Sequence, residues 1–191
     1  MTPALQTKPQ TRKSTEYHEA GHAVVARVLT MAAGRATIRP NYRDLEAGRA
    51  VLHGAYATMS EWERRGKVRE PDAVLHGRII ATMAGAETEA VLLGRTAIGD
   101  GDDRYWIAIM AEELRYSRPW ERLEPRLRAM TRMLVRRHRA LIARTAKALL
   151  KKTSISAKQL DKLIGRSVAD VKVNAPLLLV MHQQANERSL R

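Results

Sequence analysis

Apolar residues recur at the spacing of an α-helix over most of this chain. The recurrence predicts helices over residues 15–31, 73–93 and 126–152, and a further helix that begins at Arg104. Gly94 is placed to end the second of these helices, because glycine readily adopts the conformation of a helix C-terminus. Helices should therefore make up most of the fold.

Two short β-like runs follow the first predicted helix. Residues 35–40 stop at Pro40, a polar turn comes next, and residues 49–53 are placed to pair with them as a hairpin. Such a hairpin beside the first helix would present a strand edge to which an extended peptide can add by backbone pairing. An ordinary structural hairpin fits the same residues equally well.

Capping residues, glycines and prolines predict where the other elements begin and end. Gly34 is placed to end the first helix, and Pro119 and Pro125 bracket a break before the helix of residues 126–152. Ser156 and the residues after it form a capping-box pattern, which predicts a short last helix.

The chain is long enough for one domain with a sizeable core, alone or with a helical extension. Residues 1–13 have the composition of a flexible basic tail and lack the apolar centre of a secretory signal. Residues 166–191 form a C-terminal extension for which the pattern predicts no element or role. No run approaches the roughly 20 apolar residues that span a bilayer, so we expect no membrane span and a cytoplasmic location.

The composition is strongly basic, with 34 Lys and Arg against 20 Asp and Glu and a formal net charge of +14. Such an excess favours anionic partners, either an acidic protein or nucleic acid. Arginines crowd the middle of the predicted helix 126–152, although a charge run of this kind more often forms a solvated helix face. The chain has few aromatic residues and no phosphate-binding loop, which argues against a base-stacking platform and against nucleotide hydrolysis.

The first predicted helix contains the motif H-E-x-x-H. His18 and His22 lie four residues apart, so on a helix both imidazoles point from one face and can bind one ion. Glu19 lies beside His18, where it can reach a water molecule on that ion. Two polar histidines on a half-buried helix would give the same spacing. Gly21, however, is explained best if another segment approaches the helix closely at this point.

A segment rich in glycine and aspartate precedes the helix that begins at Arg104. A catalytic zinc ion takes three protein ligands and leaves one position for water, so the histidine pair needs a third ligand. The chain contains no cysteine, which leaves His, Asp and Glu as ligands. Either Asp102 or Asp103 can cap the helix N-terminus, and the other is then available for a metal ion.

Together these segments resemble the peptidase domain of the FtsH family of ATP-dependent zinc proteases. Residues 17–25 resemble the metal-binding helix of that family, residues 84–89 its G-R-A-A-E-E helix and residues 99–103 its G-A-S-N-D segment. Further likeness lies in the strands at 37–40 and 48–50 and in the helices at 149–164, so the resemblance covers roughly residues 14–165 and implies that they form one domain. The resemblance implies a mainly α (α+β) fold, with helices around a small β-hairpin or sheet beside the H-E-x-x-H helix.

The resemblance also implies roles for individual residues. It maps the third zinc ligand to Asp103, with Asp102 in place of the asparagine of the family. Glu89 is a candidate for orienting a metal-bound histidine, and Asp102 for supporting the ligands. The ATPase module and membrane anchor of the family are not present in this sequence, and Ala86 replaces its arginine. An oligomer is possible, but one assembled by an ATPase ring is not expected.

Zinc-dependent, ATP-independent hydrolysis of peptide bonds in unfolded or extended proteins is the function expected from these features. His18, His22 and Asp103 would hold Zn²⁺, and Glu19 would act as general base. The main alternative is a catalytically inactive peptidase-like domain that regulates or binds partners. A third reading is nucleic-acid association through the basic helix 126–152.

Overall fold

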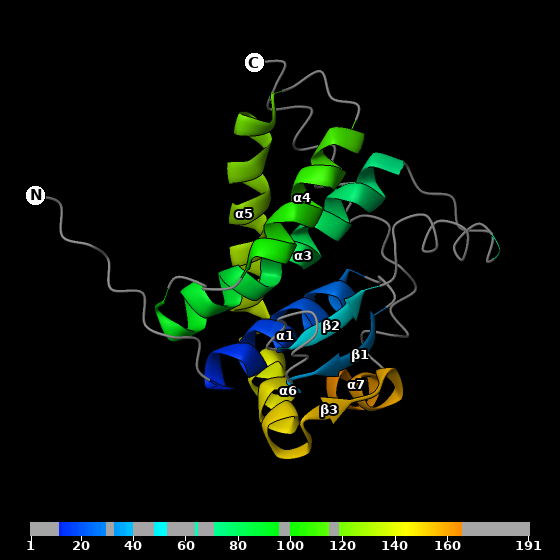
Figure 1. The fold of residues 1–191 in the computed structure, drawn as a ribbon, viewed down its shortest axis with the longest axis vertical. Helices are drawn as coiled ribbons and strands as arrows, with labels where there is room; N and C mark the ends of the chain where they lie inside the picture. Colours follow the sequence, from blue (N-terminus) through cyan, green and yellow to red (C-terminus); the bar gives the residue numbers. More distant parts are fainter. Residues whose placement is uncertain are drawn as a thin grey trace, which may run out of the picture.

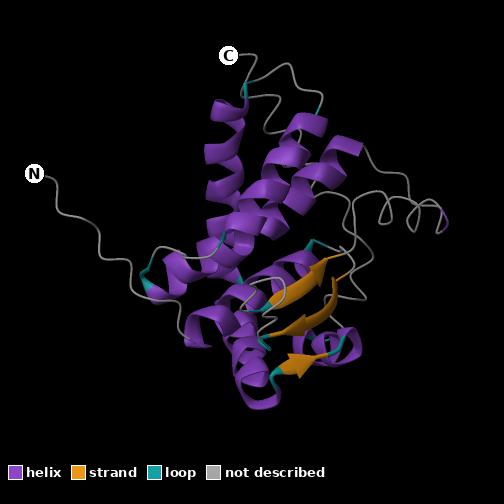
Figure 2. Ribbon diagram, viewed as in Figure 1, coloured by secondary structure: helices purple, strands orange, loops and turns teal. Residues whose placement is uncertain are grey.

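The computed structural model describes residues 12–29, 33–39, 48–52, 64, 71–95, 100–114 and 119–165. The fold is mainly helical with a small three-stranded antiparallel sheet, which confirms the predicted class (Figures 1 and 2). Among the described residues no helix combines the length and apolar character that crossing a membrane requires. The predicted extension 166–191 and most of the predicted tail 1–13 lie outside the described residues.

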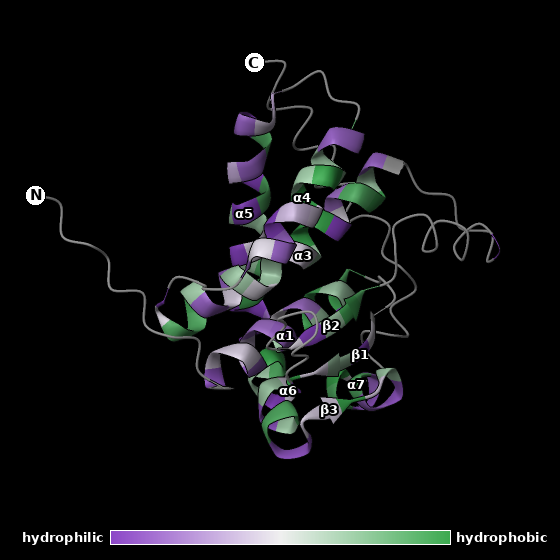
Figure 3. Cartoon of the chain, viewed as in Figure 1, coloured by the Kyte–Doolittle hydropathy of each residue, from purple (hydrophilic) through white to green (hydrophobic). Residues whose placement is uncertain are grey.

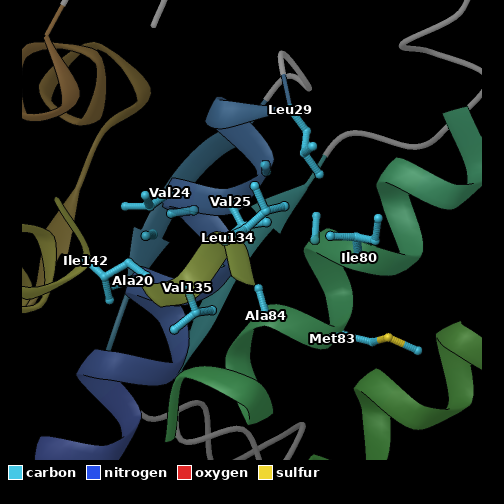
Figure 4. Packing of buried hydrophobic residues seen from close by; sticks show 14 of the residues in the cluster. Ala20, Val24, Val25, Leu29, Ile80, Met83, Ala84, Leu134, Val135 and Ile142 are labelled. Carbon is cyan, nitrogen blue, oxygen red and sulfur yellow. The ribbon is translucent and has the colours of Figure 1, made fainter. Parts of the chain in front are cut away.

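Two helices that pack against each other form the centre of the described fold. Helix α1 (Arg12–Val28) packs against α3 (Pro71–Leu93) and, with another side, against α6 (Arg139–Lys152). Figure 4 shows apolar side chains of these helices meeting in one buried cluster. Helix α1 begins three residues before the predicted start at residue 15, and Ser14 and Thr15, which could have capped it, are buried inside the helix.

The sheet lies against α1 and has the order β2-β1-β3. The predicted hairpin is present, formed by β1 (Ala33–Thr37) and β2 (Arg49–Leu52) in antiparallel register. Gly34 therefore lies within a strand and does not end α1. The third strand, β3 (Ser154–Ile155), has only two residues and was not predicted, since so short a run shows no alternation.

The basic segment was predicted as one helix, which is wrong. It forms α5 (Trp120–Arg137) and α6, separated at His138, whose backbone φ of −105° and ψ of 17° depart from the helix. The break allows the two halves to pack on different partners, α5 on α3 and α6 on α1. Helix α5 also continues through Pro125, where a break was predicted, although a proline inside a helix removes one backbone hydrogen bond.

Two shorter helices complete the described fold. Helix α7 (Ala157–Ile164) begins with the predicted capping box, in which the Gln159 N–H donates to Ser156 Oγ at 3.3 Å. Helix α4 (Gly101–Glu113) begins after Asp100, whose side chain makes no capping bond. The prediction that Asp102 or Asp103 caps this helix was therefore wrong, because both lie in its first turn. Hydrophilic and hydrophobic residues share the helices, as expected of elements half-buried around a core (Figure 3).

Candidate metal centre

Helix α1 presents both histidines of the motif toward α3 and α4. The two residues are one helical turn apart and almost fully buried, and their ring centroids are 4.7 Å apart. The rings meet nearly edge to face, at 77°, so each can direct one nitrogen to a shared point. The i, i+4 spacing read from the sequence thus leads to two neighbouring imidazoles.

Asp103 reaches this pair from the first turn of α4. Its Oδ2 lies 3.0 Å from His18 Nε2 and 3.1 Å from His22 Nε2. One ligand atom from each of the three residues lies within 4.8 Å of the others. Among the described residues, these three form the one group of His, Asp and Glu side chains close enough to hold a metal ion. The aspartate is 85 residues away from His18 in sequence, so tertiary packing alone creates this contact.

The opposite nitrogen of each ring is held by another group. His18 Nδ1 lies 2.8 Å from Glu89 Oε1, and His22 Nδ1 lies 2.8 Å from the carbonyl oxygen of Ala81. A carbonyl only accepts, so His22 Nδ1 must carry the proton that it donates. Both Nε2 atoms are thereby turned toward Asp103, with each Nδ1 engaged elsewhere.

This donor set fits a metal ion. When both imidazoles are neutral, their Nε2 atoms and the Asp103 carboxylate oxygen are all electron-pair donors, and at about 3 Å they repel one another unless they share a proton or a metal ion. Histidines and a carboxylate are common zinc ligands, and ligating histidines usually donate their other N–H to a carboxylate or carbonyl. Glu89 and Ala81 supply those two acceptors here.

Protons take the place of a metal ion when the site is metal-free. Burial lowers the pKa of His18, but hydrogen bonds with Asp103 and Glu89 outweigh it and raise that pKa to about 10. Burial likewise lowers the pKa of His22, and the charge of Asp103 more than reverses the effect. For Asp103, burial raises the pKa, but the charge of His22 and hydrogen bonds from both histidines bring it well below its usual range.

Two glycines allow the helices to come close enough for this arrangement. A Cβ on Gly85 of α3 would overlap the Nε2 atoms of both histidines. A Cβ on Gly21 of α1 would overlap the side chain of Thr88 and lie 2.6 Å from the Ala84 carbonyl oxygen. The close approach expected at Gly21 is therefore present. The place of Gly85 beside the two histidines was not predicted, because no local pattern links it to the H-E-x-x-H motif.

Glu19 is buried beside the histidines, between α1 and β2. Burial raises the pKa of its carboxyl to about 7, and the charges of His22 and His18 offset part of that effect. The backbone N–H of Ala50 in β2 donates to the carboxylate. Its Oε2 atom is buried and has no hydrogen-bond partner among the described residues, so it is free to accept a proton.

Two arginines that were not predicted lie near the centre, whereas Asp102, which was predicted to support it, does not. Arg95 Nε lies 3.5 Å from Oε2 of the fully buried Glu89. The negative charge of Asp103 raises the pKa of Arg78, against the effect of burial. Neither arginine was singled out from the sequence, because no local spacing links them to the motif. Asp102 is exposed and is not part of the His18, His22 and Asp103 group.

No protein-family model matches the chain, and no curated protein matches it either. The case for a function therefore depends on the geometry and chemistry of the centre itself.

Proposed function

We propose that the protein is a zinc-dependent peptidase. One observation carries the proposal: His18, His22 and Asp103 converge on one point, and the unpaired carboxylate oxygen of Glu19 is buried beside them. A purely structural metal site would be closed by a fourth protein ligand, whereas a catalytic one keeps three ligands and an open position. In the part of the chain that the structure describes, the group has three members next to an available base, which is typical of the second kind.

The residues of the chain have distinct roles in the proposed reaction. A bound zinc ion supplies Lewis-acid polarisation of a water molecule and of a peptide carbonyl. Glu19 takes the proton of the attacking water and later delivers it to the leaving amine, since its buried Oε2 atom has no hydrogen-bond partner among the described residues. Glu89 holds the ring of His18, and the Ala81 carbonyl holds that of His22, so neither imidazole needs to reorient.

Strand β2 supports a peptide as the substrate. Among the described strands it is the outer one, on the side away from β3, and its Ala50 N–H contacts the Glu19 carboxylate. An extended chain that paired with this edge would run past the general base, with its own backbone supplying most of the hydrogen bonds. Unfolded or extended proteins are the substrates that present such backbone, and no ATP-driven step is required for them.

Replacing Glu19 by Gln tests the proposal. The amide keeps the shape of the side chain but cannot take a proton, so we expect cleavage of an unfolded protein to fall at least about 100-fold. Zinc content, measured by mass spectrometry, should stay near one ion per chain in this variant and fall in Asp103→Asn. Undiminished cleavage by Glu19→Gln, or a wild-type protein that binds no zinc, would rule out the proposal.

A second candidate is nucleic-acid binding, which the exposed basic side chains of α5 and α6 favour. These are Arg122, Arg126, Arg136, Arg137, Arg139, Arg144, Lys147, Lys151 and Lys152. Contacts of this kind release counterions from the phosphates, so retention on DNA should fall steeply as salt is raised. Retention that is absent, or insensitive to salt, removes this candidate.

A further inference from the structure

Arg78 lies on the face of α3 that lines the candidate metal centre. It precedes Ala81 by three residues and Gly85 by seven, and residues so spaced share one side of a helix. Gly85 makes room for the two imidazoles, and the Ala81 carbonyl accepts from His22. Arg78 continues this face by one turn, in the direction of the N-terminus of α3.

The guanidinium of Arg78 reaches the same strand that Glu19 contacts. Its Nη2 donates to the carbonyl oxygen of Leu52, the last residue of β2, at 3.1 Å. Ala50, whose N–H contacts Glu19, lies two residues earlier. Alternate residues of a strand direct their backbone groups to the same side. Glu19 and Arg78 therefore meet β2 along one edge, at residues two apart along the strand.

The charge of Arg78 has no direct partner among the described residues. Its side chain is half-buried, and no carboxylate in that part of the structure forms an ion pair with it. Burial lowers the pKa of Arg78 to about 10, an effect that the charge of Asp103 opposes, so the group stays protonated at neutral pH. Asp103 itself is engaged by the two histidines. Buried cations are normally paired, and this one can still accept an anion.

We propose that Arg78 is a specificity-determining residue that binds a carboxylate of the peptide substrate. The proposal rests on the peptidase function proposed above. In a peptide paired with the edge of β2, the bond to be cleaved would lie next to Glu19. A group about two residues away from that bond would then lie next to Arg78. A guanidinium binds a carboxylate through two parallel hydrogen bonds, and the net charge of +14 also favours acidic substrates. The carboxylate is supplied by an acidic side chain or by the free C-terminus of the peptide.

A purely structural role for Arg78 makes a different prediction. If its only task is to tie β2 to α3 through the Leu52 carbonyl, its loss should disturb the strand edge for every peptide. Acidic and neutral peptides would then lose affinity by the same factor. Recognition of a carboxylate instead requires that the effect of the substitution depend on the charge of the ligand.

Peptide binding to the zinc-loaded Glu19→Gln protein separates these roles, with fluorescence anisotropy as the readout. Matched extended peptides would differ only in Glu or Gln side chains, or in a free or amidated C-terminus. We expect carboxylate peptides to bind on the order of 10- to 100-fold more tightly than their neutral partners. Adding Arg78→Gln should abolish that preference and leave neutral peptides unchanged, whereas Arg78→Lys should keep part of it.

Arg27→Gln is the matched control, because Arg27 is also half-buried and pairs with Asp161 at 3.0 Å between α1 and α7. It should leave the carboxylate preference intact. The Glu and Gln series identifies a side chain as the source, and the amidated series identifies the C-terminus; either result supports the proposal. Equal weakening of acidic and neutral peptides by Arg78→Gln, or no preference in the protein that retains Arg78, would overturn it.

This readout is independent of catalysis. Failure of the peptidase proposal appears as absent cleavage by the wild-type chain, whereas failure of the Arg78 proposal appears in binding to a protein that cannot cleave. If Arg78→Gln does not fold, the question is decided by comparing the matched peptides on the protein that retains Arg78 and on Arg78→Lys. A protein that binds none of the peptides refutes the role of Arg78.

Discussion

In both histidines, the hydrogen bond made by Nδ1 fixes the ring and so determines which group Nε2 faces. Glu89 and the Ala81 carbonyl take the two Nδ1 positions, so both Nε2 atoms point toward Asp103. The same logic extends one step outward, because Arg95 contacts the other oxygen of Glu89. The geometry of the proposed ligands therefore depends on the histidines, on Glu89 behind His18, and on Arg95 behind Glu89.

Replacing Gly85 by Ala should abolish tight metal binding while leaving the fold largely helical. The added methyl group would occupy the space of the two Nε2 atoms, so the rings must move away from Asp103. We expect zinc affinity, measured by competition with a chromophoric chelator, to fall on the order of 100-fold. Gly101→Ala is the matched control, because a Cβ there meets nothing within 4 Å. Equal zinc affinity in both variants would contradict the geometry.

Replacing Arg95 by Ala should weaken zinc binding about tenfold, since Glu89 would lose the cation that holds its second oxygen. Arg95→Lys should recover part of the loss, because it restores the charge without the guanidinium. The same chelator competition measures both, with circular dichroism to verify folding. An unchanged zinc affinity in Arg95→Ala would show that Glu89 holds His18 without help.

At the scale of elements, the centre depends on how closely α1 and α3 approach. Small residues on both helices permit that approach, with Gly21 facing Thr88 and Gly85 facing the histidines. The break at His138 serves the same packing, because α5 covers α3 while α6 covers α1. The hairpin then sets β2 against α1, where Gly48 leaves room for Glu19.

Replacing Gly21 by Ala should destabilise the protein by about 1–3 kcal/mol. Alanine favours a helix more than glycine does, but the new methyl group would overlap Thr88 and the backbone of α3. Urea unfolding followed by circular dichroism measures the change, and Gly101→Ala again serves as the control. A variant as stable as the wild type, or more stable, would mean that α1 and α3 separate at little cost.

At the scale of the whole molecule, the centre links stability to pH. Folding raises the pKa of His18 from 6.5 to about 10 and that of Glu19 from 4.5 to about 7. Each group then stabilises the fold fully below its unfolded pKa, and that contribution is lost as pH rises through its folded pKa. Asp103 acts in the opposite sense, since its lowered pKa favours the fold above its ordinary value of 3.8.

The metal-free protein should therefore lose thermal stability as pH rises from about 7 to 10, whereas the zinc-loaded protein should lose less. Bound zinc takes the place of the His18 proton and removes the largest source of the dependence. Melting temperatures with and without chelator across this range test the expectation. Parallel pH profiles for the two forms would indicate that the histidines do not titrate as the structure implies.

The sequence by itself determined the helical class, the hairpin, the capping box at Ser156 and the shared face of His18 and His22. These features depend on neighbours within a few residues, where helix and strand periodicity is decisive. It also marked the close approach at Gly21 and named Glu89 as a candidate for orienting a histidine, and through the family resemblance it named Asp103.

Only the tertiary structure decided between Asp102 and Asp103 on geometric grounds, because α4 turns one toward the histidines and leaves the other exposed. The break at His138 and strand β3 also depend on which distant surfaces meet, and so do the positions of Arg78 and Arg95. Partners far apart in the chain leave no local pattern, since contacts of that range are set by the packing of whole elements.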